Sequence, residues 1–231
     1  MSLYWQEQTK DTALNQPENV VDILFSLHGP TVPLDHAWDL SQQIQVFLPW
    51  LTQEQQAGIH LIHVAESGNG WFRPDNHESD ILYLSKRTKL TLRIPKTRIV
   101  DSGALCHQHL KLQGHTLKIG TANPRKLNLA SVLFARYVKA LAEEDEHAFL
   151  TRTVGQMNAL GLHPKKVLSG KKHTFKLARQ NVVTQSLLVA DMSQEESLLL
   201  QEHGLGEGRL FGFGLFLPHK GIHAVNEGAD V

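Results

Sequence analysis

The chain has 231 residues, of which 41% are hydrophobic, and its 23 basic and 23 acidic side chains give a formal net charge of zero. This length accommodates one domain or two small ones, and the absence of any run of about 18 apolar residues excludes a membrane-spanning helix. The one cysteine, Cys106, excludes an internal disulfide framework and, with an N-terminus that lacks the pattern of a secretory signal, predicts a cytoplasmic protein.

In the first half of the chain, apolar and β-branched runs at residues 20–27 and 58–64 predict strands. Between them a helix is expected to begin at Pro33-Leu34-Asp35, with Asp35 as its N-cap, because the apolar residues that follow repeat with the helical period. The remaining predicted elements are a loop at 66–80, a long alternating strand at 81–94, a helix at 96–110 and a strand at 114–120. The order is β-α-β-β-α-β.

The same order recurs in the second half. The predicted elements are a strand at 130–141, a helix at 145–160, a hairpin of 167–177 and 182–190, a helix from the capping box Ser193-Gln194-Glu195-Glu196 to His203, and a strand at 215–217. Two such units predict an α+β fold of tandem ferredoxin-like domains, over residues 18–122 and 128–222, with a C-terminal glycine-rich loop.

The charges are segregated along the chain. Residues 1–85 hold 11 acidic and 2 basic side chains, residues 86–190 hold 5 and 19, and residues 191–231 hold 7 and 2. Two acid-free clusters stand out: Lys86, Arg87, Lys89, Arg93, Lys96 and Arg98, and then Lys165, Lys166, Lys171, Lys172, Lys176 and Arg179. They predict a local binding face for a polyanion, the alternative being a solvated lysine-rich surface.

Residues 204–221, GLGEGRLFGFGLFLPHKG, contain six of the 17 glycines. A dinucleotide-binding fingerprint needs a strand, a glycine turn and then a helix, whereas here a helix precedes the glycines and a strand follows them. Bare backbone beside Arg209, Phe211 and Phe213 suits contact with phosphates and stacking on bases. A long hairpin-like bulge with glycines in left-handed positions is the alternative. The glycines assigned to this loop are Gly204, Gly206, Gly208, Gly212 and Gly214.

Three segments resemble one family. The glycine-rich residues GLGE (204–207) and LFGFG (210–214) are similar to the C-terminal signature of CRISPR RNA-processing endoribonucleases, which belong to the repeat-associated mysterious protein superfamily of tandem ferredoxin-like domains. The ending Pro218-His219-Lys220, together with GPTVPLDHA (29–37) and LSKRTKLTLRIP (84–95), resembles the MYXAN-subtype branch in particular. These segments occur in the same order as in the family and are spread over nearly the whole chain.

The resemblance implies an endoribonuclease that binds the repeat stem-loop of a CRISPR precursor transcript and cleaves it without a metal or other cofactor. The 2′-hydroxyl would attack the adjacent phosphate and give a 2′,3′-cyclic phosphate, and other subunits of a CRISPR interference complex would be partners. Two alternatives remain. One is a non-catalytic RNA-binding subunit of the same complex, and the other is a ferredoxin-like protein that binds a small molecule.

Such cleavage needs a general base, an acid for the leaving oxygen and a cation for the phosphorane, and histidine suits the proton transfers. His60 is the first candidate, since it begins the strand after the first helix, where family members place an active-site histidine. His36 is the second, because a helix N-terminus would lower its pKa and keep it neutral. His63 is expected to face the other way and to be structural, and His219 is left open.

The sequence departs from the family at two points. Gln45 occupies the position of a tyrosine found in some members, and the region around Glu66 lacks a lysine, so the cation would come from Lys86, Lys89 or Lys220. The hairpin over 165–179 is expected to grip the repeat stem, and the glycine loop and the strand at 86–93 are expected to position the single strand at its base. The residues predicted to contact RNA are Lys86, Arg87, Lys89, Arg93, Lys165, Lys166, Lys171, Lys172, Arg209 and Lys220.

Overall fold

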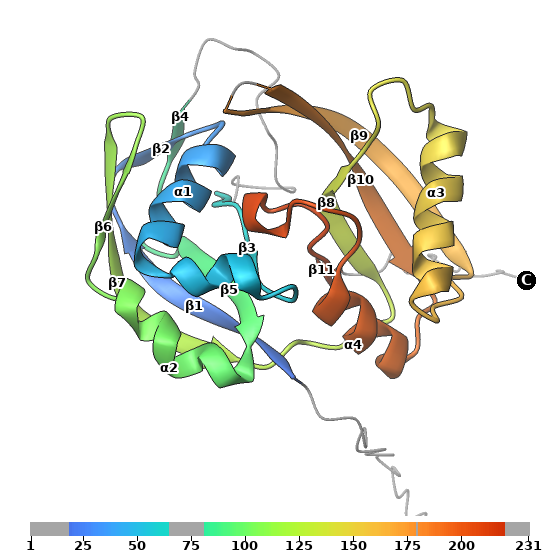
Figure 1. Ribbon diagram of the computed structural model, residues 1–231, viewed down its shortest axis with the longest axis horizontal. Coiled ribbons are helices and arrows are strands. Elements are labelled where there is room, and N and C mark those ends of the chain that lie inside the picture. Colours follow the sequence, from blue (N-terminus) through green and yellow to red (C-terminus); the bar gives the residue numbers. More distant parts are fainter. Residues whose placement is uncertain (1–18, 65–80, 179, 220–231) are drawn as a thin grey trace, which may run out of the picture.

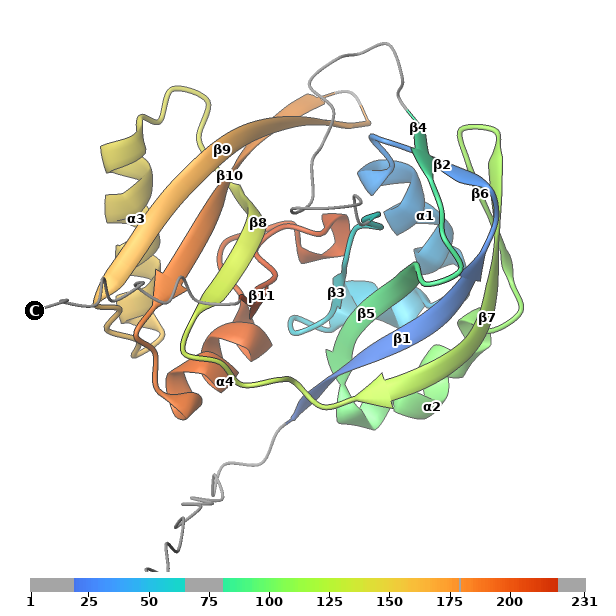
Figure 2. The same ribbon diagram turned by 180° about the vertical axis from the view of Figure 1, so that it is seen from behind.

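The computed structural model describes residues 19–64, 81–178 and 180–219. The predicted loop at 66–80, Arg179 and Lys220 lie outside these ranges. Figures 1 and 2 show two β-sheets next to each other, with the glycine-rich segment, red in Figure 1, lying between them. No helix in the described ranges is long and apolar enough to cross a membrane.

The first sheet has the strand order β3-β5-β1-β7-β6, and each neighbouring pair is antiparallel. Its strands are β1 (Val20–His28), β3 (Gly58–Ile59), β5 (Lys89–Pro95), β6 (His109–Leu112) and β7 (His115–Arg125). Alternate residues of β1, such as Ile23 and Phe25, pack in one core with the apolar face of α1 (Ala37–Phe47). The residues between them lie on the opposite, open face of the sheet.

The second sheet has the order β11-β8-β10-β9. Its strands are β8 (Leu133–Lys139), β9 (Lys166–Leu177), β10 (Gln180–Ala190) and β11 (Leu217–Pro218). Helices α3 (Glu146–Ala159) and α4 (Gln194–His203) pack on it. The capping box at Ser193 starts α4 as predicted, and the basic hairpin forms as β9 and β10. In each unit the first and third strands of the β-α-β-β-α-β order lie side by side inside the sheet: β1 and β5 in the first unit, β8 and β10 in the second. This arrangement confirms the tandem ferredoxin-like fold.

Four local predictions for the first unit are wrong. Of the strand predicted at 58–64, only β3 forms, and it ends at Ile59. The stretch at 96–110 is a four-residue helix, α2 (Ile99–Ser102), between 3₁₀ turns at Lys96–Arg98 and Gly103–Leu105. His107 then adopts φ 66° and its N–H bonds to the Ile119 carbonyl at 3.0 Å, so the chain turns back to pair with β7. The long strand at 81–94 is two strands, because the chain turns at Ser85 and Thr88. Of these, β4 (Ile81–Tyr83) pairs with β2 (Thr31–Pro33).

The fourth correction concerns the start of α1. His36, rather than Asp35, occupies the N-cap position, and it makes no side-chain capping bond. The Asp35 Oδ2 atom accepts instead from the Lys176 N–H on β9, at 3.0 Å. The first helix is therefore attached at its N-terminus to the basic hairpin of the second unit.

The two units share an apolar core. Phe175, Leu177 and Val182 from the basic hairpin, Tyr137 from β8 and Phe213 from the glycine-rich segment belong to the same buried cluster as β1 and α1. Phe175 packs edge-on against Tyr137, with 4.8 Å between ring centroids, and lies 5.1 Å from Phe213. This continuous packing fixes the relative orientation of the sheets, and so the geometry of any site between them.

Candidate functional site

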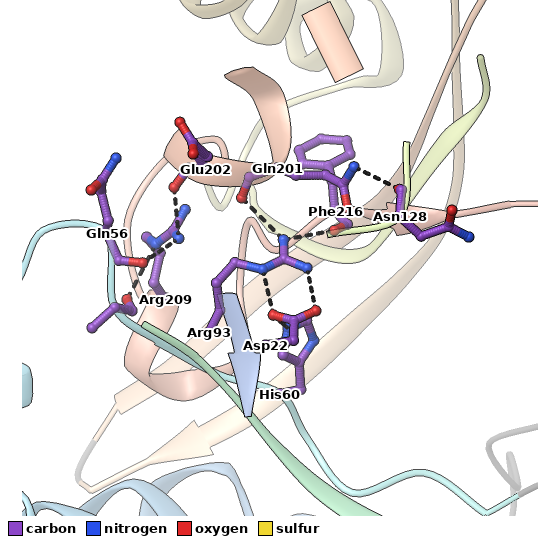
Figure 3. Close-up of polar contacts among 10 residues, drawn as sticks. Asp22, Gln56, His60, Arg93, Asn128, Gln201, Glu202, Arg209 and Phe216 are labelled. Carbon is purple, nitrogen blue, oxygen red and sulfur yellow. Dashed lines mark hydrogen bonds and ion pairs between the residues drawn. The ribbon is translucent and has the colours of Figure 1, made fainter. Parts of the chain in front are cut away.

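A buried arginine links the two units (Figure 3). The Arg93 side chain is fully buried, with 0% exposed, and its Nε and Nη2 atoms donate to the two carboxylate oxygens of Asp22 at 2.8 and 3.0 Å. Its Nη1 atom donates to the backbone carbonyls of Gln201 on α4 and Phe216 before β11, at 3.0 and 2.8 Å. Burial raises the pKa of the Asp22 carboxyl, but the charge and hydrogen bonds of Arg93 outweigh it and leave that pKa below its ordinary value.

Arg209 makes a second link from the glycine-rich segment. Its Nε atom donates to the Ala57 carbonyl at 3.2 Å, and its Nη2 atom to the carbonyls of Gln56 and Glu202 at 2.7 and 3.0 Å. Burial, and then the nearby charge of Arg93, lowers its pKa to about 10, so Arg209 stays charged at neutral pH. Arg93 and Arg209 therefore hold the units together from the interior, where RNA has no access, and their assignment as RNA contacts does not agree with this placement.

The glycine-rich segment is a packed connection whose glycines occupy left-handed positions, the one feature that the alternative interpretation expected. All five of its assigned glycines have φ between 64° and 90°. Phe213 is buried, and the Phe211 ring stacks on Trp38 of α1 with 5.7 Å between centroids, so both rings already pack on protein groups rather than facing a base. A Cβ on Gly212 would lie 3.2 Å from the Ile59 carbonyl oxygen and 2.7 Å from the Leu61 side chain, the two residues that flank His60.

We predict that Gly212→Ala costs more stability than Gly206→Ala. Both glycines have left-handed backbones, which cost a residue with Cβ about 1–2 kcal/mol, but a Cβ on Gly206 meets open space. Gly212→Ala must also push the segment that carries His60, so its cleavage rate should fall as well. Urea unfolding and single-turnover cleavage of both variants measure this, and equal effects of the two would contradict the predicted contact.

His60 lies where β3 ends, next to β5. Its backbone N–H donates to the Thr91 carbonyl at 2.9 Å, and its side chain, 11% exposed, points toward Asp22 with 3.9 Å between Nε2 and Oδ1. Among the described residues, the His60 Nε2 atom has no hydrogen-bond partner. Burial, followed by the charge of Arg93, lowers the pKa of His60 to about 4, while Asp22 acts in the opposite direction. His60 is therefore a neutral imidazole at physiological pH and can accept a proton.

His36 is placed differently. It is 2% exposed, its Nδ1 lies 2.7 Å from the Pro33 carbonyl oxygen, and its Nε2 accepts from the Ile62 N–H at 3.0 Å. Because a carbonyl can only accept, the proton of the neutral ring is on Nδ1. Both ring nitrogens are thus occupied in bonds that attach the start of α1 to the segment after His60. This placement does not agree with the predicted role of His36 as a second base.

A cavity of about 110 Å³ opens between the two units beside His60. Both units supply its polar and aromatic lining, which includes His60, His63, Arg136, Tyr137 and His219. The prediction that His63 faces away from His60 is wrong, because β3 ends at Ile59 and the alternation of a strand does not continue to residue 63. Burial lowers the pKa of Arg136, whose guanidinium lies 5.8 Å from the centroid of the Phe134 ring.

A β-bulge explains why Arg136 and Tyr137 both reach this cavity. Val138 of β8 pairs with Gln185 of β10, and Ala135 pairs with Leu187, so two residues of β8 stand opposite the single residue Ser186. Such an insertion interrupts the alternation of side chains and re-aims them locally. Neither residue was selected from the sequence, since nothing in the local pattern of β8 predicts the extra residue.

The exposed basic residues form two separate groups. Lys86, Arg87 and Lys89 lie at the turn before β5 and at its start, and the others lie at or along the edge strand β9. Of the second group, Lys166 pairs with Asp191 at 2.9 Å, and Lys172 donates to the Glu144 carbonyl at 2.8 Å. Lys165 and Lys171 are exposed as well. All seven are accessible, and their contact with RNA stays a prediction.

A family model described as Cas6 Crispr matches residues 21–221. The chain belongs to the Cas6 family. The resemblance drawn from the glycine-rich segment is thereby confirmed. The chain is 31% identical to a protein of Myxococcus xanthus (strain DK1622) named CRISPR-associated endonuclease Cas6. The alignment spans 198 residues, which are 86% of this chain and 81% of the relative.

Solved structures with the same architecture include a RAMP protein described as binding different RNA substrates. Its TM-score is 0.61 at 16% identity, over 85% of this chain and 98% of that one. A Cas6-related protein from Pyrococcus furiosus gives a TM-score of 0.59 at 16% identity, over 85% and 97%. At these identities the likeness shows the Cas6 fold, and the chemistry has to be argued from the cavity.

Proposed function

We propose that this Cas6-family chain is an endoribonuclease that binds and cleaves the repeat of CRISPR precursor transcripts, without a metal ion. The observation that carries the proposal is a neutral, nearly buried imidazole, His60, at a cavity that also holds an arginine. The name of the Myxococcus xanthus relative, an endonuclease associated with CRISPR, supports the choice of substrate.

His60 would act as the general base. Its neutral ring accepts the proton of the 2′-hydroxyl while that oxygen bonds to the adjacent phosphorus, and the bond from phosphorus to the 5′-oxygen breaks. The products are a 2′,3′-cyclic phosphate and a 5′-hydroxyl. Arg136, the one lysine or arginine among the described lining residues, supplies the positive charge for the phosphorane, in place of Lys86 or Lys89. His219, which comes from the second unit, would protonate the leaving oxygen.

The lowered pKa of His60 predicts an unusual pH profile. In the free protein a base with a pKa of about 4 stays deprotonated well below the range of an ordinary imidazole, near 6.5. We therefore expect no loss of kcat/KM as the pH falls from 7 to about 5, and a decline only toward pH 4. A bound phosphate favours the imidazolium and raises this pKa, so the decline of kcat should begin at higher pH.

This profile is measured with single-turnover cleavage between pH 4 and 8, with circular dichroism at each pH to verify folding. If kcat/KM instead declines around pH 6.5 on acidification, in protein that is still folded, then burial does not lower the pKa of the catalytic base and the argument for His60 is wrong.

The substrate assignment is tested with a CRISPR repeat RNA and an unrelated stem-loop of equal length. We expect one cut per repeat and none in the control RNA. Tight binding without a cut would favour a non-catalytic RNA-binding subunit, and no affinity at all would favour a small-molecule binder. Retention of the cleaved guide after the reaction would support assembly with other interference subunits, whose presence is part of this proposal.

A further inference from the structure

The open face of the first sheet contains a second hollow, of about 390 Å³, away from the cavity of His60. Figure 2 views the sheet from this face, with α1 behind it. The lining residues are Ser26, His28, His107, Lys118, Gly120 and Thr121. They come from β1, β7 and the turn before β6. In the sheet, β5 separates these elements from β3, the strand that His60 follows.

A β-bulge and a glycine lie at the floor of this hollow. Ala122 of β7 pairs with Phe25 of β1, and Ile119 pairs with Leu27, so Gly120 and Thr121 together stand opposite Ser26. A Cβ on Gly120 would overlap the Ser26 hydroxyl and lie 3.2 Å from Nε2 of His28. Gly120 is not among the residues with positive φ, so the backbone does not require a glycine there, and the missing side chain leaves room for the Ser26 hydroxyl. The floor is bare backbone with one hydroxyl.

The rim of the hollow has the chemistry of an anion site. Lys118 pairs across the strands with His28, and both are exposed, as are His107 and Thr121. The lining contains no carboxylate, and no ion pair with a described residue occupies the Lys118 ammonium. One ammonium, two imidazoles and two hydroxyls around bare backbone suit a phosphate together with its sugar.

The hollow lies on the same sheet face as His60. The His60 N–H bonds to Thr91, Thr91 pairs with Leu24, and Ser26 and His28 follow at alternate positions of the same strand. Lys89 pairs with Ser26 and is exposed on this face between the two sites. With strands about 4.8 Å apart and about 3.3 Å per residue, the hollow is on the order of 15 Å from His60, a distance that a few nucleotides of single-stranded RNA can span.

We propose that this hollow is a subsite for one nucleotide of the single-stranded RNA that runs from the cleavage site across the open face. Lys118 and His28 hold its phosphate, and the floor at Gly120 and Ser26 receives its sugar. The subsite rests on the proposed function, because it binds the substrate of that cleavage. It fixes the strand at a second point and so sets which phosphate lies beside His60.

The test uses the full-length chain and a repeat RNA with a 2′-deoxy nucleotide at the cleavage site, so that binding is measured without cleavage. The RNA is shortened by one nucleotide at a time from its single-stranded end. For the unmodified protein, affinity should drop about tenfold at one particular nucleotide. In the variant Lys118→Ala with His28→Ala that step should disappear, and the slope of log K against log salt should fall by about 1.

Lys111→Ala is the matched control, since Lys111 is exposed on β6, next to β7, and does not line the hollow. The subsite is overturned if the double variant keeps the step, or if Lys111→Ala removes it equally. The two proposals fail separately. If the unmodified protein binds and cleaves repeat RNA but the double variant keeps the affinity step, only the subsite proposal is wrong. If the unmodified protein neither binds nor cleaves the RNA, the proposed function is wrong.

Discussion

His60→Ala is expected to slow repeat cleavage by about a thousandfold and to leave RNA affinity within about twofold of the unmodified protein. A positioned general base contributes about 10²–10⁴ to the rate, and the His60 ring makes no hydrogen bond among the described residues that a smaller side chain would break. Single-turnover cleavage gives the rate, and binding of a 2′-deoxy repeat gives the affinity.

Two histidine variants serve as controls for this result. His109→Ala changes an exposed residue on β6, away from the cavity, and should leave the rate unchanged. His36→Ala removes both bonds of a buried ring, so it should lower the melting temperature as well as the rate. A His60→Ala protein that cleaves at the unmodified rate would exclude His60 as the base.

Arg93→Met is expected to lower the free energy of unfolding by about 3–5 kcal/mol. Removing one partner of a buried ion pair leaves the other charge without compensation, and here the Asp22 carboxylate would lose both of its bonds to Arg93. The carbonyls of Gln201 and Phe216 would lose their donor at the same time, which loosens the second unit from the first. Urea unfolding followed by circular dichroism measures the change.

The double variant Asp22→Asn with Arg93→Met isolates the uncompensated charge. It should recover a substantial part of the lost stability, because no buried carboxylate remains unpaired. Arg87→Met, which removes an exposed arginine near the start of the same strand, should stay within about 0.5 kcal/mol of the unmodified protein. A loss for Arg93→Met as small as that for Arg87→Met would show that the buried link contributes little.

The fold could be predicted from the sequence wherever the local pattern of residues determines the secondary structure. The alternating residues of β1, the helical period of α1 and the capping box at Ser193 all correspond to elements of the structure. The stretch at 96–110 could not be predicted, because the left-handed His107 that follows the short turn at Gly103 is stabilised by pairing with β7, which the local sequence does not reveal.

The same distinction applies to the site. His60 was selected through the family resemblance, but Arg93 and Arg209 look like surface cations in the sequence. Arg93 is on the open face of β5 and would be exposed if α4 and the segment at Phe216 did not cover it. Its partners there, Gln201 and Phe216, are 108 and 123 positions away. Arg136 and Tyr137 reach the cavity through a bulge that pairing with β10 defines. Contacts between the two units therefore decide which charged residues are available for chemistry.

The measurement that tests the central claim most directly is cleavage of the cognate repeat in excess EDTA, with and without a single 2′-deoxy nucleotide before the cleaved phosphate. The account predicts full cleavage in the chelator, a product ending in a 2′,3′-cyclic phosphate, and no cleavage of the 2′-deoxy repeat. Cleavage that stops in EDTA, or that continues on the 2′-deoxy repeat, would contradict attack by the 2′-hydroxyl with His60 as its base.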